Sequence, residues 1–255
     1  MQFPVYVFGI HPHFLFEAIA YFIGFRVYLY TRNKERIPMD KAMWVIVGAI
    51  FGAAFGSKFL YWFEDPYKTI EHWTNFTYML EGKTIVGGLL GGLIGVEFAK
   101  KCIGWKRSTG DDFVLPLTVG MMLGRIGCFL TGMDDHTYGT ATTWITGVDF
   151  GDGIKRHPTQ LYEIVFLFTL IFILLTIKKK KTILWEGYLF QLFMLSYLVF
   201  RLIIDFIKPT PHPYFYLNNI QVACLIGIVY YIHLMIKKGK HHLHFRKGEE
   251  QIHAK

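Results

Sequence analysis

An arginine interrupts the glycine-spaced, apolar stretch MMLGRIGCFLTGMDD at residues 121–135. A guanidinium group keeps its charge away from water, and its planar fork matches the geometry of phosphate oxygens. Arg125 could therefore bind an anionic ligand, pair with a carboxylate, or reach water by extending its side chain. No carboxylate lies at helical spacing from it within its own stretch, so a charge partner must come from another helix, a loop or a ligand.

A second arginine, Arg201, lies in the apolar stretch YLVFRLIIDFIKP with Asp205 four residues later. This spacing puts both side chains on one face of a helix, where they can pair directly. Asp205 could hold Arg201 in the orientation needed to bind a ligand, or the two could form a purely structural ion pair. Both readings remain open from the sequence.

The elements that must position these residues are membrane-spanning helices. The chain has 255 residues, of which 53% are hydrophobic and 18% aromatic, and this is too apolar for an ordinary soluble domain. A hydrocarbon core of about 30 Å requires about 20 mostly apolar residues per helix. An all-α integral membrane protein of about seven transmembrane helices is predicted, with spans near residues 14–31, 42–63, 84–99, 113–132, 160–177, 184–207 and 217–236.

The basic residues predict how these spans are oriented. Most lysines and arginines follow every second predicted span, in residues 32–41, 100–107, 178–181 and 237–255, and so lie on one side of the membrane. Because basic residues gather in cytoplasmic loops, the N-terminus is expected outside and the C-terminus in the cytoplasm. The net charge of +8 belongs to these clusters, which meet anionic lipid, so nucleic acid is not expected as a partner.

One membrane domain is expected over residues 1–236. It would carry a polar outer insertion at 133–158, and a basic tail would follow at 237–255. Glycines recur every four residues at 48–56 and at 87–95, a spacing that permits close helix packing in lipid. The three cysteines indicate neither a disulfide framework nor a zinc motif, and no metal or other cofactor is predicted.

Ionisable side chains inside spans cost free energy unless they face a partner or a wet cavity. Arg26 and Glu97 lie near predicted cytoplasmic ends, where their side chains can reach water. Glu17, Lys58 and Glu163 lie nearer the outer ends of their spans. Glu17 could act as a base or could pair with Lys58 or a loop donor.

Four stretches of the chain resemble motifs of the prolipoprotein diacylglyceryl transferases. They are EGKTIVGGLLGGLIG (81–95), GRIGCFLTG (124–132), RHPTQLYE (156–163) and YLVFRLIIDFIKP (197–209). Their order and the seven spans also fit that family. The resemblance implies transfer of the diacylglyceryl group of phosphatidylglycerol to a lipobox cysteine thiol, with release of glycerol phosphate, at the outer face of a bacterial inner membrane.

The resemblance also implies roles for individual residues. Arg125 matches an arginine that contacts the phospholipid head group, and Arg201 and Tyr197 match an essential arginine and the tyrosine one turn before it. His157 matches the histidine of the His-Pro string. Together with Glu17, the expected catalytic residues are Arg201, His157 and Tyr197. The expected substrate-binding residues are Arg125, Gly127, Cys128, Gly132, Gly87, Gly88, Gln160, Tyr162, Glu163 and Asp205.

Several positions depart from the family pattern. Val86 replaces the usual histidine before the glycine pair, and Cys128 replaces the usual asparagine. Thr131-Gly132-Met133 replaces Asn-Gly-Glu, and Glu17 lies near the place of a tyrosine. Because valine cannot accept a proton, another group must take the thiol proton if the reaction is the same.

Glu17, and then His157 and His136, are the replacement candidates for that proton acceptor. For His157, a structural hydrogen bond in the outer loop is the competing reading. Cys128 could be a nucleophile, and the competing reading is that it packs as a small residue. The alternative functions are transfer to a different acceptor and a catalytically altered paralogue that binds or presents phospholipid. A small transporter is disfavoured, because no internal repeat is evident.

Overall fold

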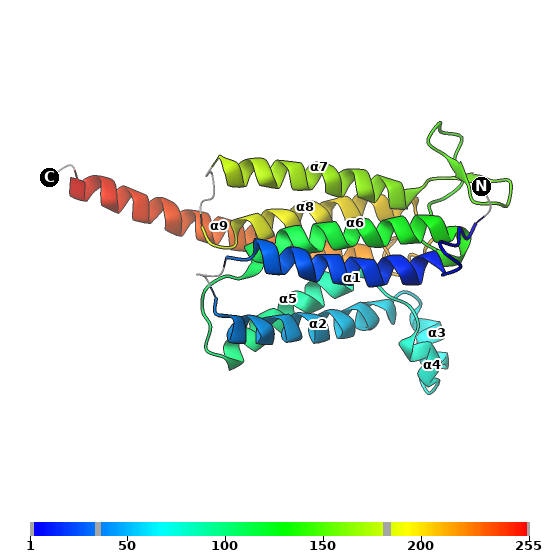
Figure 1. Cartoon of the computed structure of the whole chain (residues 1–255), viewed down its shortest axis with the longest axis horizontal. Coiled ribbons are helices and arrows are strands. Elements are labelled where there is room, and N and C mark those ends of the chain that lie inside the picture. The colour runs from blue at the N-terminus through cyan, green and yellow to red at the C-terminus, as the bar shows by residue number, and fades with distance from the viewer. Residues whose placement is uncertain (1–2, 34–36, 181–184, 254–255) are drawn as a thin grey trace. The chain divides into compact units, whose positions relative to one another are not determined.

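The computed structural model describes residues 3–33, 37–180 and 185–253 (Figure 1). Long helices occupy all seven predicted stretches, which confirms the all-α membrane fold class. They are α1 (Pro12–Thr31), α2 (Met39–Tyr61), α5 (Ile85–Cys102), α6 (Val114–Thr131), α7 (Thr159–Lys179), α8 (Tyr188–Ile204) and α9 (Asn219–His253).

Within the described residues, six helical segments are long and apolar enough to cross a membrane. Helix α5 is not among them, and it carries Glu97, Lys100 and Lys101 close together near its end. The prediction that 84–99 forms a helix is thus confirmed, whereas its crossing of the membrane stays a prediction. Of the basic residues used to predict orientation, Lys34, Arg36, Lys181 and Lys255 lie outside the described residues.

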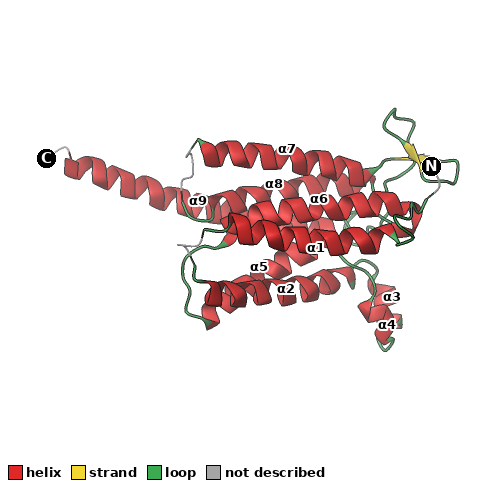
Figure 2. Cartoon of the chain, in the orientation of Figure 1, coloured by secondary structure: helices red, strands yellow, loops and turns green. Residues whose placement is uncertain are grey.

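Shorter elements connect the long helices. They are α3 (Pro66–Glu71), α4 (Phe76–Leu80), the 3-10 turns η1 (Gly110–Phe113), η2 (Gly132–Asp135) and η3 (Asp205–Ile207), and the strands β1 (Val148–Asp149) and β2 (Lys155–Arg156). The strands pair antiparallel inside the predicted polar insertion. Figure 2 shows this strand pair in yellow.

The chain forms two compact units. The first comprises Met1–Asn33, Asp112–Lys181 and Ile203–Thr210, and the second comprises Lys34–Asp111, Thr182–Leu202 and Pro211–Lys255. The first unit contains α1, α6, α7 and the strand pair, and the second contains α2, α5 and α9. Helix α8 begins in the second unit and ends in the first.

In the second unit, α2 and α5 pack along a seam of glycines. A Cβ atom added to Gly48 would lie 2.6 Å from the carbonyl oxygen of Gly95, and one added to Gly56 would lie 2.7 Å from the Cα of Gly91. The two backbones are therefore too close for any side chain between them. This confirms the close helix approach predicted from the four-residue glycine period.

In the first unit, α1 packs on α6, and α6 packs on α7. A Cβ added to Gly127 would lie 2.6 Å from the Cβ of Phe16 and 3.2 Å from the carbonyl oxygen of Pro12. At the other end of the same helix pair, the rings of Tyr28 and Phe113 stack with their centroids 5.0 Å apart. The glycine thus lets the first turns of α1 lie directly on the C-terminal part of α6.

Candidate active site

Arg125 forms a buried ion pair with a carboxylate from another helix. Its Nε lies 2.8 Å from Oε2 of Glu163 on α7, and the side chains are only 6% and 2% exposed. This confirms that the charge partner of Arg125 comes from outside its own span. Since a buried charge is stable only when it is paired, Glu163 fixes where the guanidinium group can lie.

Gln160 lies one turn before Glu163 on α7. Its side chain is 1% exposed, and neither its amide nitrogen nor its amide oxygen has a hydrogen-bond partner among the described residues. Buried polar atoms are nearly always satisfied by protein, water or a ligand. The amide of Gln160 could therefore accept or donate a hydrogen bond to a bound molecule, and its predicted part in substrate binding stays a prediction.

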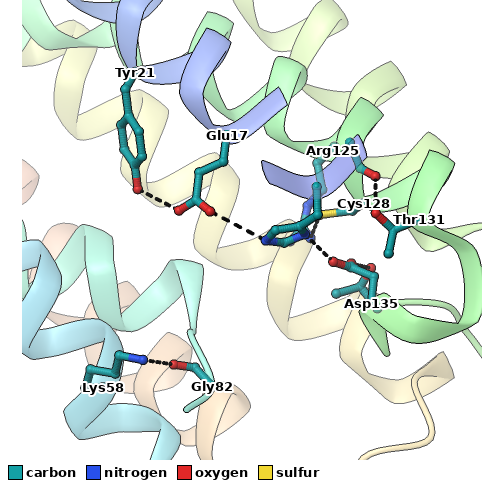
Figure 3. Close-up of polar contacts among 11 residues, drawn as sticks. Glu17, Tyr21, Lys58, Gly82, Arg125, Cys128, Thr131 and Asp135 are labelled. Carbon is teal, nitrogen blue, oxygen red and sulfur yellow. Dashed lines mark hydrogen bonds and ion pairs between the residues drawn. The ribbon is translucent and has the colours of Figure 1, made fainter. Parts of the chain in front are cut away.

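A histidine that the sequence did not single out lies beside Cys128. His13 is in the first turn of α1, and its Nδ1 lies 2.7 Å from Oδ1 of Asp135, which follows α6 in η2. The donor atoms of His13, Cys128 and Asp135 all lie within 4.8 Å of one another. Figure 3 shows Glu17, Cys128 and Asp135 in this region.

Arg125 adjoins this cluster. Its Nη1 donates a hydrogen bond to Sγ of Cys128 over 3.7 Å, one turn along α6 (Figure 3). The buried ion pair and the His13 cluster are thus neighbouring parts of one polar region within the apolar first unit. An anion held by Arg125 would lie next to the sulfur of Cys128.

Glu17 lies on the other side of His13. Its Oε2 is 3.6 Å from Nε2 of His13, and its Oε1 accepts a hydrogen bond of 3.0 Å from the hydroxyl of Tyr21 (Figure 3). These residues lie four apart along α1, so they share one face of the helix. The proposed roles of Glu17, as a base or as a partner of Lys58, both stay predictions.

His157 and Tyr162 organise the polar insertion. Nδ1 of His157 lies 3.1 Å from the hydroxyl of Tyr162, whose oxygen is also 2.7 Å from the hydroxyl of Thr146. The backbone amide of His157 donates to the carbonyl of Thr140 at 3.1 Å. These contacts favour the structural reading of His157. His136, another candidate, is exposed at the end of η2.

One ion pair of this insertion lies outside the spans, and its effect on stability can be measured as a function of pH. Nη1 of Arg156 is 2.7 Å from Oδ1 of Asp152. The hydrogen bond from the guanidinium lowers the pKa of Asp152 below its ordinary value of 3.8. The carboxylate form of Asp152 therefore stabilises the strand pair.

The predicted residues of the later spans are buried. Arg201 is 3% exposed, while Tyr197 and Asp205 are fully buried. Tyr197 stacks on Phe193, with ring centroids 6.2 Å apart, and Lys208 lies 3.7 Å from Asp205. Arg201 belongs to the second unit and Arg125 to the first, so their convergence on one ligand stays a prediction.

Several predicted substrate-binding glycines have a packing role in the structure. Gly127 admits Phe16, as described above. Gly132 has a φ of +73°, and a Cβ there would lie 2.5 Å from the Cβ of Phe3. A Cβ on Gly87 would lie 2.8 Å from the Cβ of Leu60, whereas one on Gly88 would make only ordinary contacts. Val86 is completely buried, so the position of the usual histidine is filled by packed aliphatic carbon.

Apolar helices around a buried arginine, its carboxylate partner and an unsatisfied amide define an integral membrane protein with a buried polar region. The family model for prolipoprotein diacylglyceryl transferase matches residues 1–237. The chain therefore belongs to the prolipoprotein diacylglyceryl transferase family, and the predicted family, transferase class and membrane location are confirmed.

Similar proteins carry the same name. A phosphatidylglycerol–prolipoprotein diacylglyceryl transferase of Chlorobaculum tepidum is 30% identical over 250 residues, covering 86% of this chain and 82% of the relative. The protein of that name from Clostridium tetani is 34% identical over 193 residues, covering 72% and 76%. The Campylobacter lari protein is 30% identical and covers 82% and 80%.

Proposed function

We propose that this chain transfers the diacylglyceryl group of phosphatidylglycerol to the thiol of a prolipoprotein cysteine. The names of the relatives described above state this activity. The observation that carries the proposal is the buried Arg125–Glu163 pair beside the unsatisfied amide of Gln160. This arrangement offers guanidinium and amide N–H donors to a phosphate in an otherwise apolar region, with the charge of Arg125 balanced by Glu163.

In the proposed reaction, the acceptor thiol loses its proton to a carboxylate or to water, and its sulfur attacks the carbon of the diacylglyceryl group that is bonded to the phosphate oxygen. The new bond is carbon–sulfur, and the carbon–oxygen bond breaks. Its electron pair stays on the phosphate oxygen, so glycerol phosphate leaves with the developing negative charge. A preorganised cation in a dry site stabilises such charge without reorganising at the moment of reaction.

Individual side chains have defined parts in this proposal. Arg125 binds the phosphate and stabilises the leaving group, and Glu163 holds the guanidinium in place. The amide nitrogen of Gln160 donates to a phosphate oxygen. Arg201, with Tyr197 one turn before it on α8 and Asp205 four residues after it, keeps the part of the family's essential arginine that the resemblance implies.

We place the reaction in the bacterial inner membrane. The N-terminus would lie outside and the C-terminus in the cytoplasm. The reason is that the basic residues cluster in every second connection between spans, as they do in cytoplasmic loops. The site would then lie near the outer face, where the ends of α1 and α6 meet the polar insertion. The family resemblance implies a reaction at that face.

The test is transfer by the purified full chain in proteoliposomes containing labelled phosphatidylglycerol and a lipobox peptide. Labelled peptide and free glycerol phosphate are expected in equal amounts. Arg125→Ala should abolish transfer, whereas Arg26→Ala, which removes an exposed arginine from α1, should not. Absence of labelled peptide, with an active relative run alongside, would refute the proposal.

A catalytically altered paralogue that holds phospholipid is the second candidate, and the buried Val86 favours it. This protein would retain labelled phosphatidylglycerol through purification without forming any product. Arg125→Ala would abolish that retention, while Glu17→Gln and His157→Ala would leave it unchanged. The same proteoliposome experiment therefore separates the two functions.

A further inference from the structure

Three side chains with different metal-binding atoms meet where α1 begins and α6 ends. His13 offers an imidazole nitrogen, Cys128 a sulfur and Asp135 a carboxylate oxygen, and these atoms lie within 4.8 Å of one another. The Asp135 side chain is only 4% exposed, and Cys128 is buried. Three potential ligands thus converge on one point that is partly closed to solvent.

We propose that His13, Cys128 and Asp135 bind a divalent metal ion of the zinc type. Zinc takes nitrogen, sulfur and carboxylate oxygen ligands together, while calcium and magnesium prefer sites made of oxygen alone. Three protein ligands leave the fourth tetrahedral position open, which is the arrangement of catalytic rather than structural zinc.

The surrounding hydrogen bonds fit an outer shell of such a site. Glu17 faces the Nε2 side of His13 at 3.6 Å, so Nδ1 is the nitrogen directed toward Asp135 and is the one available to the metal. Tyr21 in turn orients Glu17, and the hydroxyl of Thr137 donates to Oδ2 of Asp135. A carboxylate on the second nitrogen of a ligating histidine is the usual outer-shell partner.

The backbone holds the three ligands in place. The contact of Gly127 with Phe16 brings the first turn of α1 onto α6, and the amide of Val5 donates to the carbonyl of Leu130 at 2.9 Å. Cys128 and Asp135 are thus fixed by one helix and the turn that follows it. Ligands on rigid elements keep the geometry that a metal requires.

The position of the cluster suggests what the metal does, and this step rests on the proposed function. On binding the open position, the acceptor thiol would release its proton to water and remain as a thiolate. Since Nη1 of Arg125 lies 3.7 Å from Sγ of Cys128, that thiolate would lie next to the bound phosphate ester. The metal would thereby activate the thiol in place of the histidine that the family usually has at the position of Val86.

The first experiment measures metal binding directly. The full chain, purified in detergent and stripped with a chelator, is titrated with Zn²⁺ and separately with Co²⁺. One ion per chain is expected, and the Co²⁺ form should show a thiolate-to-metal charge-transfer absorption. Cys128→Ser should remove that absorption, whereas Cys102→Ser, which changes an exposed cysteine, should retain it.

Variants of the other residues test the ligand set. Asp135→Asn should weaken Zn²⁺ binding, while Asp134→Asn, at the adjacent exposed carboxylate, should not. Glu17→Gln should weaken binding by about 10–100-fold, the usual effect of an outer-shell change. His13→Gln should weaken it more than Glu17→Gln does. Thermal unfolding of each variant confirms that it is folded.

The outcomes separate the two proposals. If the folded chain binds no Zn²⁺, or if Cys128→Ser binds it as tightly, the metal site is refuted. Transfer to the lipobox peptide that persists after complete metal removal refutes the role of the metal and leaves the proposed function intact. Tight Zn²⁺ binding without any transfer supports the site and refutes the proposed function.

Discussion

Two helix pairs use glycine to approach closely, with opposite consequences. Between α2 and α5, glycines on both helices face each other, so backbone meets backbone over two turns and more. Between α1 and α6, Gly127 admits Phe16 and the carbonyl of Pro12. The first contact excludes side chains, whereas the second places His13, Cys128 and Asp135 together.

The difference shows how the surroundings of a glycine determine its role. A repeated glycine stripe leaves no room for polar groups, and it serves association of helices in lipid. A single glycine near the ends of two helices lets side chains from both helices converge, so that ionisable groups can form a cluster there. The α2–α5 contact is therefore expected to govern stability, and the α1–α6 contact to govern chemistry.

The largest expected effect is at the buried ion pair of the first unit. Glu163→Leu leaves the Arg125 guanidinium without its carboxylate and should lower the free energy of unfolding by about 3–5 kcal/mol. The double variant Arg125→Met/Glu163→Leu should recover most of that loss while remaining inactive. Chemical unfolding in detergent and the transfer assay measure the two properties. A double variant as unstable as the single one would contradict this account.

The glycine seam of the second unit should come next. A Cβ on Gly52 would lie 2.9 Å from the Cα of Gly95, and a backbone atom cannot move aside as a side chain can. Gly52→Ala is expected to cost about 1–3 kcal/mol, as overpacking does. Gly92→Ala is the control, because its Cβ would meet Ala53 at an ordinary 3.5 Å. Equal melting temperatures for the two variants would be inconsistent with the seam.

Gly127→Ala should have a smaller effect on stability and a larger one on the site. The added Cβ presses on Phe16, which can shift with the first turn of α1, so a cost of about 1 kcal/mol is expected. That shift would move His13 away from Cys128 and weaken Co²⁺ binding. Gly124→Ala serves as the control, since a Cβ there meets nothing within 4 Å. Unchanged Co²⁺ spectra in Gly127→Ala would show that the contact does not position the ligands.

The smallest effect is expected at the exposed Asp152–Arg156 pair. Because the pKa of folded Asp152 lies below 3.8, its contribution is present above about that pH and is lost as the pH falls through the folded value. At neutral pH, Asp152→Asn should speed hydrogen exchange of amides in residues 150–156. At a pH below the folded pKa, it should exchange like the parent chain. A constant difference at all pH values would exclude this pair as the cause.

Composition and spacing predict much of the fold. Apolar stretches of the right length gave all seven long helices, and the glycine period gave the α2–α5 contact. The partner of Arg125 could be restricted to another element because no carboxylate has helical spacing from it. Glu163 itself could be singled out as a site residue only because it belongs to the His-Pro string.

The cluster around His13 could not be predicted in the same way. His13 and Asp135 are separated by 122 positions, and no spacing rule joins residues on different helices. One available signal was the face of α1 shared by His13, Glu17 and Tyr21. A second signal was that Glu17 and Cys128 both differ from the usual residues of the family. Both lie at ends of spans that meet in the structure. Neither signal includes Asp135, whose place depends on the turn that ends α6.

The sulfur of Cys128 brings with it a vulnerability to oxidants. An asparagine, the usual residue of the family at this position, does not react with peroxide, whereas a cysteine passes through a reversible sulfenic acid to irreversible products. An oxygen added to this sulfur would crowd the hydrogen bond between His13 and Asp135, whose atoms lie within 4.8 Å of the sulfur. Preparations kept without a reducing agent are therefore expected to lose the function of this site while the helices stay folded.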